Sequence, residues 1–295
     1  MLDMRETFLS TIDEMLDADP RLVLVLAEIS AAQLAGTRRR HPDRVLNVGI
    51  REQALVGVTG GLALAGLRPV AHSFPPFLVE RPYEQVKLDL THQGVGAVLV
   101  SAGASYDRSS DGRTHQSPGD VALLDTIPGW TVHVPGHPEE ARRLLLESLP
   151  GDGSVYLRLS SQANAEPHLG AGFQTVRQGH DGVVLAVGPL LDNVLAATEG
   201  LDVTVLYAHT VRPFDAKSLR AATNDRADVV LVEPYLAGTS AHHVAEALAD
   251  VPHRLLSLGV RRDAEVRLYG TPADHDAAHG LDVPGLTSAI RGFYG

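Results

Sequence analysis

The 295-residue chain contains no cysteine, which excludes disulfides, thiolate nucleophiles and thiolate metal sites. Positive charge is scarce, because 25 Lys and Arg stand against 36 Asp and Glu and give a formal net charge of −11. This charge provides no electrostatic reason to bind nucleic acid or an anionic membrane. No apolar run approaches the roughly 20 residues that span a bilayer, and the N-terminal stretch mixes charged and apolar residues unlike a signal peptide. We therefore expect a cytoplasmic protein with no nucleic-acid or membrane partner.

Short β-branched apolar runs alternate with longer amphipathic stretches along the chain. This alternation is typical of βαβ units and predicts the α/β class, with mainly parallel, twisted sheets flanked by helices. Periodicity is lost between Ser160 and Asp181, so we predict two domains, 1–165 and 181–295, joined by a linker at 166–180. The expected strands are Leu22–Ala27, Val45–Val48, Ala97–Val100, Thr131–Val134, Val155–Leu159, Val183–Val187, Val203–Tyr207, Val229–Val232 and Leu255–Leu258. The expected helices include Arg51–Ala65, Pro138–Leu149, Asp192–Thr198, Lys217–Thr223 and Ala241–Ala249.

The most informative stretch is Arg44–Gly66, where a short strand leads through Gly49 into a helix rich in Ala, Gly and Leu. Glu52 falls at the strand-to-helix junction, where side chains point into the crevice beyond the sheet. By itself this is also the pattern of a helix whose first turn carries an acidic residue to complement the helix dipole.

The pattern NVGIREQ (47–53) resembles the glutamate motif in the pyrimidine-binding domain of transketolase, deoxyxylulose-phosphate synthase and the β subunits of 2-oxo-acid dehydrogenases. The resemblance implies thiamine diphosphate as cofactor, a pyrimidine-binding domain at 1–165 and a transketolase C-terminal domain at 181–295. It also implies that Glu52 is catalytic and binds the aminopyrimidine ring. Protonation of that ring favours the imino tautomer, whose imino group removes the thiazolium C2 proton.

Two aromatic residues follow, Phe74 and Phe77, in a segment interrupted by two prolines. Read alone, they are core aromatics in a loop. In the resembling family, aromatics at this place form the hydrophobic slot that holds the aminopyrimidine ring, so Phe74 and Phe77 are predicted to bind the cofactor. The similarity extends to the segment AEIS (Ala27–Ser30), and we assign Ile29 to the cofactor as well.

The segment RPYEQVKLD, which begins at Arg81, is similar to a helix start in the deoxyxylulose-phosphate synthase branch. The resemblance makes Arg81 a candidate for substrate binding. A surface ion pair with Glu80 or Glu84 is the alternative interpretation.

The loop DGRTHQSPGD, from Asp111 to Asp120, matches the family pattern D-G-x-T-H. The resemblance implies that His115 lies over the cofactor and binds substrate oxygens, as a catalytic and substrate-binding residue. It likewise implies that Asp111 contacts a substrate hydroxyl. Read alone, the segment is a polar loop with an exposed histidine, but three motifs in the family's order support one another.

Several departures from the family pattern concern the substrate. The usual proline of D-G-P-T-H is Arg113, which we predict to place a cation at the substrate channel. Arg158 is also predicted to bind substrate, but Ser160 and Ser161 stand where the family often has a further arginine for phosphate. Fewer arginines should weaken phosphate binding, because Arg–phosphate pairs are bidentate and charge-assisted. We therefore expect a changed donor or acceptor, in secondary metabolism, with Arg113 and Arg108 as possible replacements.

A complete enzyme of this kind also needs a diphosphate-binding domain, in which G-D-G and a later asparagine hold Mg²⁺. Here Gly151–Gly153 precedes a strand and lacks an asparagine at the family spacing, so we interpret it as a turn and predict no metal ligands in this chain. The resemblance thus implies a split enzyme whose partner subunit carries the diphosphate and Mg²⁺ ligands. By analogy we expect a heterotetramer with two copies of each chain.

The leading functional hypothesis is transfer of a two-carbon ketol unit from a ketose sugar to an aldehyde. One alternative is a decarboxylating subunit, like the E1β subunit of a 2-oxo-acid dehydrogenase or deoxyxylulose-phosphate synthase. The other is a non-catalytic scaffold subunit that has kept the fold.

Overall fold

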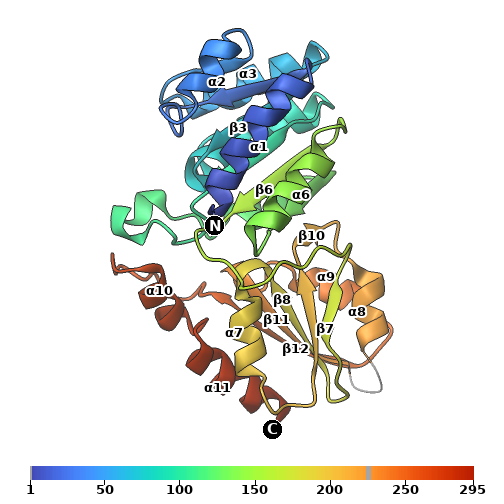
Figure 1. The fold of residues 1–295 in the computed structure, drawn as a ribbon. Helices are drawn as coiled ribbons and strands as arrows, with labels where there is room; N and C mark the ends of the chain where they lie inside the picture. The colour runs from blue at the N-terminus through green and yellow to red at the C-terminus, as the bar shows by residue number, and fades with distance from the viewer. Residues whose placement is uncertain (1, 224–226) are drawn as a thin grey trace.

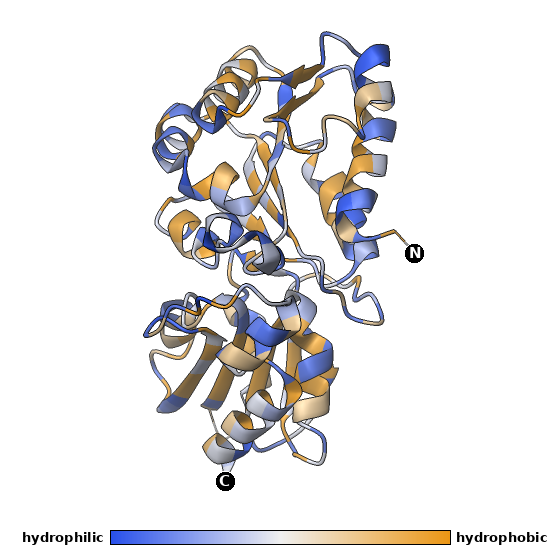
Figure 2. Ribbon diagram, turned by 90° about the vertical axis from the view of Figure 1, so that its left-hand side faces the viewer, coloured by the Kyte–Doolittle hydropathy of each residue, from blue (hydrophilic) through white to orange (hydrophobic). Residues whose placement is uncertain are grey.

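The computed structural model describes residues 2–223 and 227–295, which form two α/β domains stacked end to end (Figure 1). Both sheets are mainly parallel and have helices on their faces, so the predicted fold class is confirmed. In Figure 2 the strands are mostly hydrophobic, while the helices mix hydrophobic and hydrophilic residues. This is the pattern of amphipathic helices that cover a buried sheet.

The first domain contains the strands β1 (Leu22–Leu26), β2 (Val45–Asn47), β3 (Arg68–Ser73), β4 (Val98–Ala102), β5 (Trp130–His133), β6 (Ser154–Leu159) and, from further along the chain, β10 (Thr210–Arg212). They form one sheet in the order β10-β5-β6-β4-β3-β1-β2, parallel except for the pair β10 and β5. Its helices are α1 (Met4–Ala18), α2 (Ala35–Arg40), α3 (Glu52–Leu64), α4 (Tyr83–Gln85), α5 (Asp120–Leu124) and α6 (Pro138–Ser148). Shorter helical segments are the π-helices η1 (Pro76–Glu80) and η2 (Val86–His92) and the 3-10 turns η3 (Ser109–Asp111) and η4 (Arg113–His115).

The second domain contains the strands β7 (Gln174–Arg177), β8 (Val183–Val187), β9 (Thr204–Ala208), β11 (Ala227–Leu236) and β12 (His253–Val260). Their order is β12-β11-β8-β9-β7, and the pair β7 and β9 is antiparallel. The helices are α7 (Leu191–Ala197), α8 (Ala216–Ala222), α9 (Ala241–Ala247), α10 (Pro272–His279) and α11 (Val283–Tyr294), with the 3-10 turn η5 (Gly188–Leu190). Within the described ranges, none of the helices combines the length and apolar character that crossing a membrane would require.

Helix α1 shows how local sequence sets the start and the buried face of an element. Asp3 accepts a hydrogen bond from the backbone of Glu6, and the Glu6 carboxylate accepts one from the backbone of Asp3, which makes a capping box. Residues spaced by four then share one face of the helix and pack on the sheet beside α6; these are Met4, Phe8, Ile12 and Leu16.

Among the strands that the described residues form, β3, β7 and β10 lie outside the predicted set. β3 contains Arg, Pro, His and Ser, yet all its residues are buried, so its polar composition concealed a central strand. β7 lies inside the predicted linker 166–180, so the second sheet begins before residue 181. β10 leaves the second domain to pair with β5, and the two domains therefore share backbone hydrogen bonds. Edge strands of three or four residues are too short to give a periodicity signal.

Candidate active site

Glu52 lies in the first turn of α3, directly after the loop that leaves β2. Within this loop Gly49 has a φ of +73°, a left-handed conformation that favours glycine. Glu52 is only 4% exposed, and Arg81 Nη1 donates to its Oε1 over 2.8 Å. A buried carboxylate needs such a partner, because burying an unpaired charge is costly.

Phe74, Phe77 and His115 form an aromatic cluster beside this ion pair. The ring centre of His115 lies 5.1 Å from that of Phe77 and 5.9 Å from that of Phe74. The guanidinium carbon of Arg81 lies 4.3 Å from the centre of the Phe77 ring, so one cation connects Glu52 to the cluster. Phe77 belongs to the π-helix η1, a conformation that recurs at functional sites. The structure therefore brings together predicted residues from three distant parts of the sequence.

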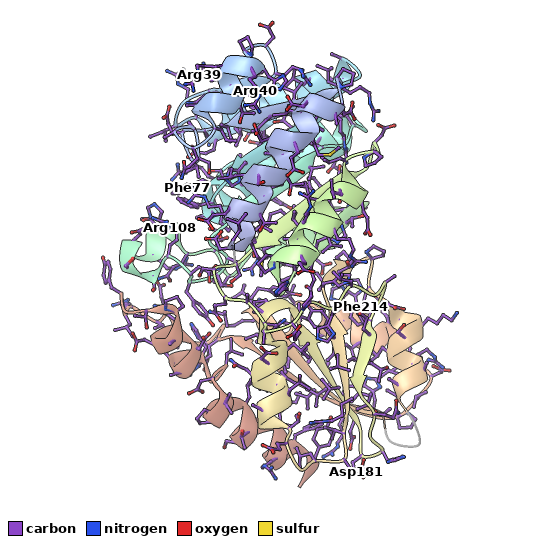
Figure 3. The ribbon with its side chains drawn as sticks, viewed as in Figure 1. Arg39, Arg40, Phe77, Arg108, Asp181 and Phe214 are labelled. Atoms are coloured by element: carbon purple, nitrogen blue, oxygen red, sulfur yellow. The ribbon has the colours of Figure 1, made fainter. Side chains whose placement is uncertain are left out.

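Arg108 and Asp111 border the other side of this cluster. The Arg108 guanidinium carbon lies 4.4 Å from the centre of the Phe74 ring, and Arg108 forms an ion pair with Asp111. Figure 3 shows Phe77 and Arg108 on the same edge of the first domain. A cavity of about 200 Å³ opens here, and its lining includes Arg5, Phe74, Arg108, Ser160 and Ser161.

Arg5 and Asp107 also belong to the lining of this cavity, and sequence reasoning missed both. Arg5 lies on α1, remote in sequence from every motif, and its guanidinium is 5.9 Å from the centre of the Phe74 ring. Burial raises the pKa of Asp107 to about 6, although hydrogen bonds from the backbone N–H of Ser161 (2.7 Å) and from Ser160 Oγ (3.1 Å) act in the opposite direction. The position of Asp107 next to Arg108, ahead of the DGRTH loop, was the one available sequence signal.

Ile29, the remaining predicted cofactor residue, lies half-buried in the loop after β1. Its neighbours Glu28 and Ser30 have φ values of +65° and +64°, which is a strained conformation for residues other than glycine. Asn47 Oδ1 accepts hydrogen bonds from the backbone N–H groups of Glu28 and Gly49, both over 3.1 Å. Asn47 thereby holds the Ile29 loop against the loop that leads into α3.

Arg158 does not join this group. It is 1% exposed, its Nε donates to Asp120 Oδ2 over 2.7 Å, and its Nη2 donates to Ser105 Oγ over 2.7 Å. These contacts are those of a buried structural ion pair, and they do not favour the predicted role in substrate binding, which would require access from solvent. We therefore leave Arg158 out of the proposed site.

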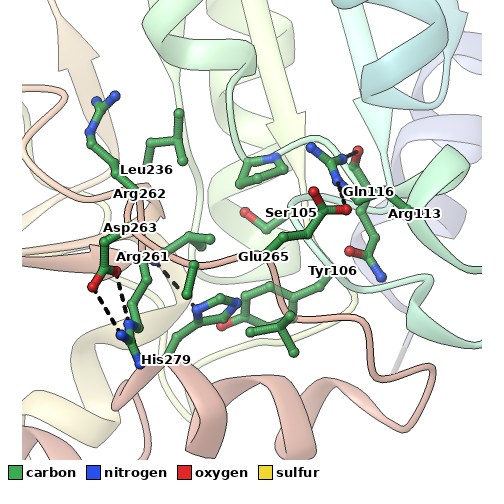
Figure 4. Close-up of a pocket in the computed structure, with 14 residues that line it drawn as sticks. Ser105, Tyr106, Arg113, Gln116, Leu236, Arg261, Arg262, Asp263, Glu265 and His279 are labelled. Carbon is green, nitrogen blue, oxygen red and sulfur yellow. Dashed lines mark hydrogen bonds and ion pairs between the residues drawn. The ribbon is translucent and has the colours of Figure 1, made fainter.

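Arg113 points to a different cavity from the one beside Phe74. Its Nη1 donates to the carbonyl of Gln116 over 2.8 Å, and its Nε lies 3.5 Å from Glu265 Oε1. Figure 4 shows Arg113 in the lining of a cavity of about 370 Å³ between the domains, together with Arg261, Arg262 and His279. The cation predicted for the substrate channel is thus engaged by the second domain.

Arg81 makes neither of the ion pairs considered from the sequence. It pairs with Glu52, while Glu80 Oε1 accepts a hydrogen bond from Ser117 Oγ over 2.8 Å. Glu84 is exposed.

The residues that converge here fit the aminopyrimidine of thiamine diphosphate. The planar Arg81 cation is hydrogen-bonded to Glu52 and stacked over Phe77, which shows that this carboxylate and this ring accommodate a flat, basic group. With Arg81 on Oε1, the other carboxylate oxygen of Glu52 would serve a ring nitrogen as acceptor, and the Phe74 and Phe77 cluster would offer an aromatic surface to an apolar ring face.

Comparison with known families agrees with this geometry. Residues 1–166 match the model of the transketolase pyrimidine-binding domain, and residues 172–284 match that of the transketolase C-terminal domain. The chain belongs to the transketolase family. The family identified from the sequence motifs is confirmed, and dependence on thiamine diphosphate is a property of that family.

Similar proteins include subunits of transketolases. The chain is 59% identical to the 33.6 kDa protein in the fasciation locus of Rhodococcoides fascians, over 99% of this chain and 95% of that protein. It is 32% identical to the 6-deoxy-6-sulfo-D-fructose transketolase subunit SqwH of Clostridium sp. strain MSTE9, with coverages of 88% and 84%. It is 30% identical to an apulose-4-phosphate transketolase subunit of Actinobacillus succinogenes, with coverages of 96% and 94%.

A solved structure shares the fold over the full length. A split gene transketolase, described as an inactive β4 tetramer, aligns with a TM-score of 0.85 and covers 100% of this chain and 99% of that chain. The identity is 23%, so the likeness is one of fold.

Proposed function

We propose that this chain is one subunit of a two-component transketolase-like enzyme that transfers a two-carbon ketol unit from a ketose to an aldehyde. The observation that carries the proposal is the approach of Glu52, Phe77 and His115 around one ion pair. SqwH and the apulose-4-phosphate enzyme's subunit, each named as part of a transketolase, align over most of their length and support the two-component organisation.

The partner subunit would carry the diphosphate-binding domain and the Mg²⁺ ligands, with two copies of each chain in a heterotetramer. This assignment is supported by the family models that match this chain, which are those of the pyrimidine-binding and C-terminal domains of transketolase. The cytoplasmic location expected from the sequence is part of the same proposal.

When bound, thiamine diphosphate supplies a carbon nucleophile for the ketose carbonyl. Glu52 would hold the proton at the pyrimidine nitrogen, from a carboxylate that is almost wholly shielded from water. Phe74 and Phe77 would exclude water from the ring. His115, which meets both phenyl rings edge to face, would bind the substrate oxygens, and Asp111 would accept a hydrogen bond from a substrate hydroxyl.

The cavity beside Phe74 suggests a substrate that is not recognised mainly through phosphate. Ser160 and Ser161 line it at the place where the family resemblance predicts a further arginine, and Arg113 lies 3.5 Å from Glu265 elsewhere. Two cations line the cavity: Asp111 already neutralises part of the charge of Arg108, and Arg5 donates to Ser30 Oγ through Nε and Nη2. A changed sugar substrate, as expected for secondary metabolism, is therefore part of the proposal.

The test is reconstitution with the partner, recognised by a G-D-G motif and a later asparagine, in the presence of thiamine diphosphate and Mg²⁺. Hydroxypyruvate and a panel of ketoses should be turned over by the mixture and by neither chain alone. Glu52→Gln should lower kcat by about 10²–10⁴-fold, whereas Glu84→Gln, an exposed carboxylate nearby, should retain activity. An inactive but fully assembled complex would refute the proposal.

A decarboxylating reaction is the second candidate, favoured by the RPYEQVKLD segment that carries Arg81. Turnover of pyruvate in place of ketoses, with the same dependence on Glu52, would select it. A non-catalytic scaffold subunit is distinguished from both candidates, because its function in the complex should not change after Glu52→Gln.

A further inference from the structure

Three metal-ligating side chains from both domains meet at the domain junction. Asp125 directly follows α5 of the first domain, and His242 and His243 lie on α9 of the second. One ligand atom from each of the three lies within 4.8 Å of the others. His243 Nε2 is 3.3 Å from Asp125 Oδ1, and His242 Nε2 is 3.4 Å from Asp125 Oδ2.

These separations also suit neighbouring ligands of a common metal ion. His243 Nε2 is hydrogen-bonded to Asp125 Oδ1 over 3.3 Å, at the long end of the usual range, while the contact of His242 Nε2 with Oδ2 over 3.4 Å is an ion-pair distance. In a tetrahedral zinc site with bonds of about 2.0–2.1 Å, neighbouring ligand atoms are separated by about 3.3–3.4 Å. The two imidazoles are also adjacent, with their ring centres 3.9 Å apart.

Neighbouring side chains fix the orientation of His243 and Asp125. The other ring nitrogen of His243, Nδ1, lies 3.7 Å from Glu246 Oε2, and its ring stacks on Phe214 with centres 5.4 Å apart. The Glu246 carboxylate is too distant here for a hydrogen bond, but it lies on the side where metal-bound histidines commonly present their second nitrogen to a carboxylate. Arg212 Nε donates to Asp125 Oδ1 and orients the carboxylate, while Oδ2 faces His242.

Access from solvent is preserved at one side of the cluster. The His242 side chain is 52% exposed, although the Asp125 side chain is only 13% exposed. Phe214 stacks on His243, and Figure 3 shows it in the part of the second domain that adjoins the first.

We propose that Asp125, His242 and His243 bind a divalent transition metal such as Zn²⁺, with water in the fourth position. Two imidazoles and one carboxylate select such an ion over Mg²⁺, which prefers oxygen ligands. Such an ion would fasten α9 to the first domain. The inference does not depend on the proposed catalytic function.

The test uses the full chain without an affinity tag, freed of metal with chelator and titrated with Co²⁺ as a spectroscopic probe. We expect saturation near one Co²⁺ per chain, visible absorption typical of four-coordinate Co²⁺, and displacement by Zn²⁺. His242→Ala removes a half-exposed side chain and should fold normally, yet it should weaken Co²⁺ binding at least tenfold. The double variant His242→Ala/His243→Ala should bind none.

The matched control is His180→Ala, which removes another exposed histidine, 3.1 Å from Asp202. It should bind Co²⁺ like the wild type. Zn²⁺ should raise the Tm of the wild type and of this control but not of the double variant. Absence of saturable Co²⁺ binding to the wild type, or equal binding by the double variant, would overturn the proposal and leave a His–Asp contact between domains.

Discussion

Arg81 Nη1 lies 2.8 Å from Glu52 Oε1, although 29 positions separate the two residues in the sequence. The same guanidinium stacks over Phe77, with its carbon 4.3 Å from the ring centre. Arg81 therefore sets the orientation of the carboxylate and of the aromatic surface that we assign to the cofactor. We regard it as a positioning residue for Glu52, and no longer as a direct ligand of the substrate.

Replacing Arg81 by Ala should lower kcat/KM of the reconstituted enzyme by about ten- to a hundredfold, because a hydrogen bond between charged groups contributes about 1.5–3 kcal/mol. Arg81→Lys keeps the charge but loses the planar stacking surface, so its activity should be intermediate. Arg51→Ala, at an exposed position beside Glu52, is the control and should stay near wild type. Unchanged kcat/KM in Arg81→Ala would remove the positioning role.

Discrimination between phosphorylated and unphosphorylated ketoses should be modest, less than about a hundredfold in kcat/KM, and should rest on Arg108 together with Arg5. Arg108→Ala should reduce this discrimination, because this cation faces the cavity beside Phe74, where Arg5 remains as a second one. Arg113→Ala should leave it intact, since Arg113 is directed to Glu265. The measurement is kcat/KM for matched pairs of substrates. A preference for phosphate of several orders of magnitude in the wild type would contradict the proposed change of substrate.

Arg158 should prove structural. Arg158→Met leaves Asp120 buried without its counter-charge, and breaking such a buried pair costs about 3–5 kcal/mol. We expect a clear fall in Tm and in the free energy of unfolding by urea. The milder Arg158→Lys should also lower Tm, while KM for the sugar substrate stays within about twofold of wild type. A large increase in KM without loss of stability would restore the substrate-binding assignment.

His72 should make the folded chain less stable in mild acid. Burial lowers the pKa of His72 to about 4, even though the hydrogen bond of its Nδ1 to the carbonyl of Val100, over 2.8 Å, acts in the opposite direction. Above about pH 6.5 the imidazole is neutral in both the folded and the unfolded chain; between about pH 6.5 and 4 only the unfolded chain takes up the proton. Stability should therefore fall with falling pH, by about 2 kcal/mol from His72 between pH 7 and 5.

The measurement for His72 is urea unfolding of the wild type and of His72→Gln at pH 7 and pH 5. The variant should be less stable at pH 7 but should lose less stability on acidification. Burial also lowers the pKa values of His133 and His279 to about 4. These two histidines account for the pH dependence of the free energy of unfolding that remains in the variant. If the free energy of unfolding of His72→Gln falls between pH 7 and pH 5 as much as that of the wild type, the assignment is refuted.

The sequence by itself determined the fold class and the chemical groups of the candidate site. The predicted strand Val183–Val187 is β8 residue for residue, because a continuous β-branched run is stable mainly inside a parallel sheet. Glu52 and His115 were recognisable because each sits in a motif whose spacing is local. Both inferences use only residues that lie close together in the sequence.

Only the tertiary structure decided which of these groups meet. The pairing of Arg81 with Glu52, the burial of Arg158 on Asp120 and the approach of His242 to Asp125 all join elements far apart in sequence. Such pairings follow from how sheets and helices pack, and no periodicity in the chain records them. For the same reason the polar strand β3 was missed, since Arg68 becomes buriable only when the carbonyls of Ser148 and Gly153 accept its hydrogen bonds.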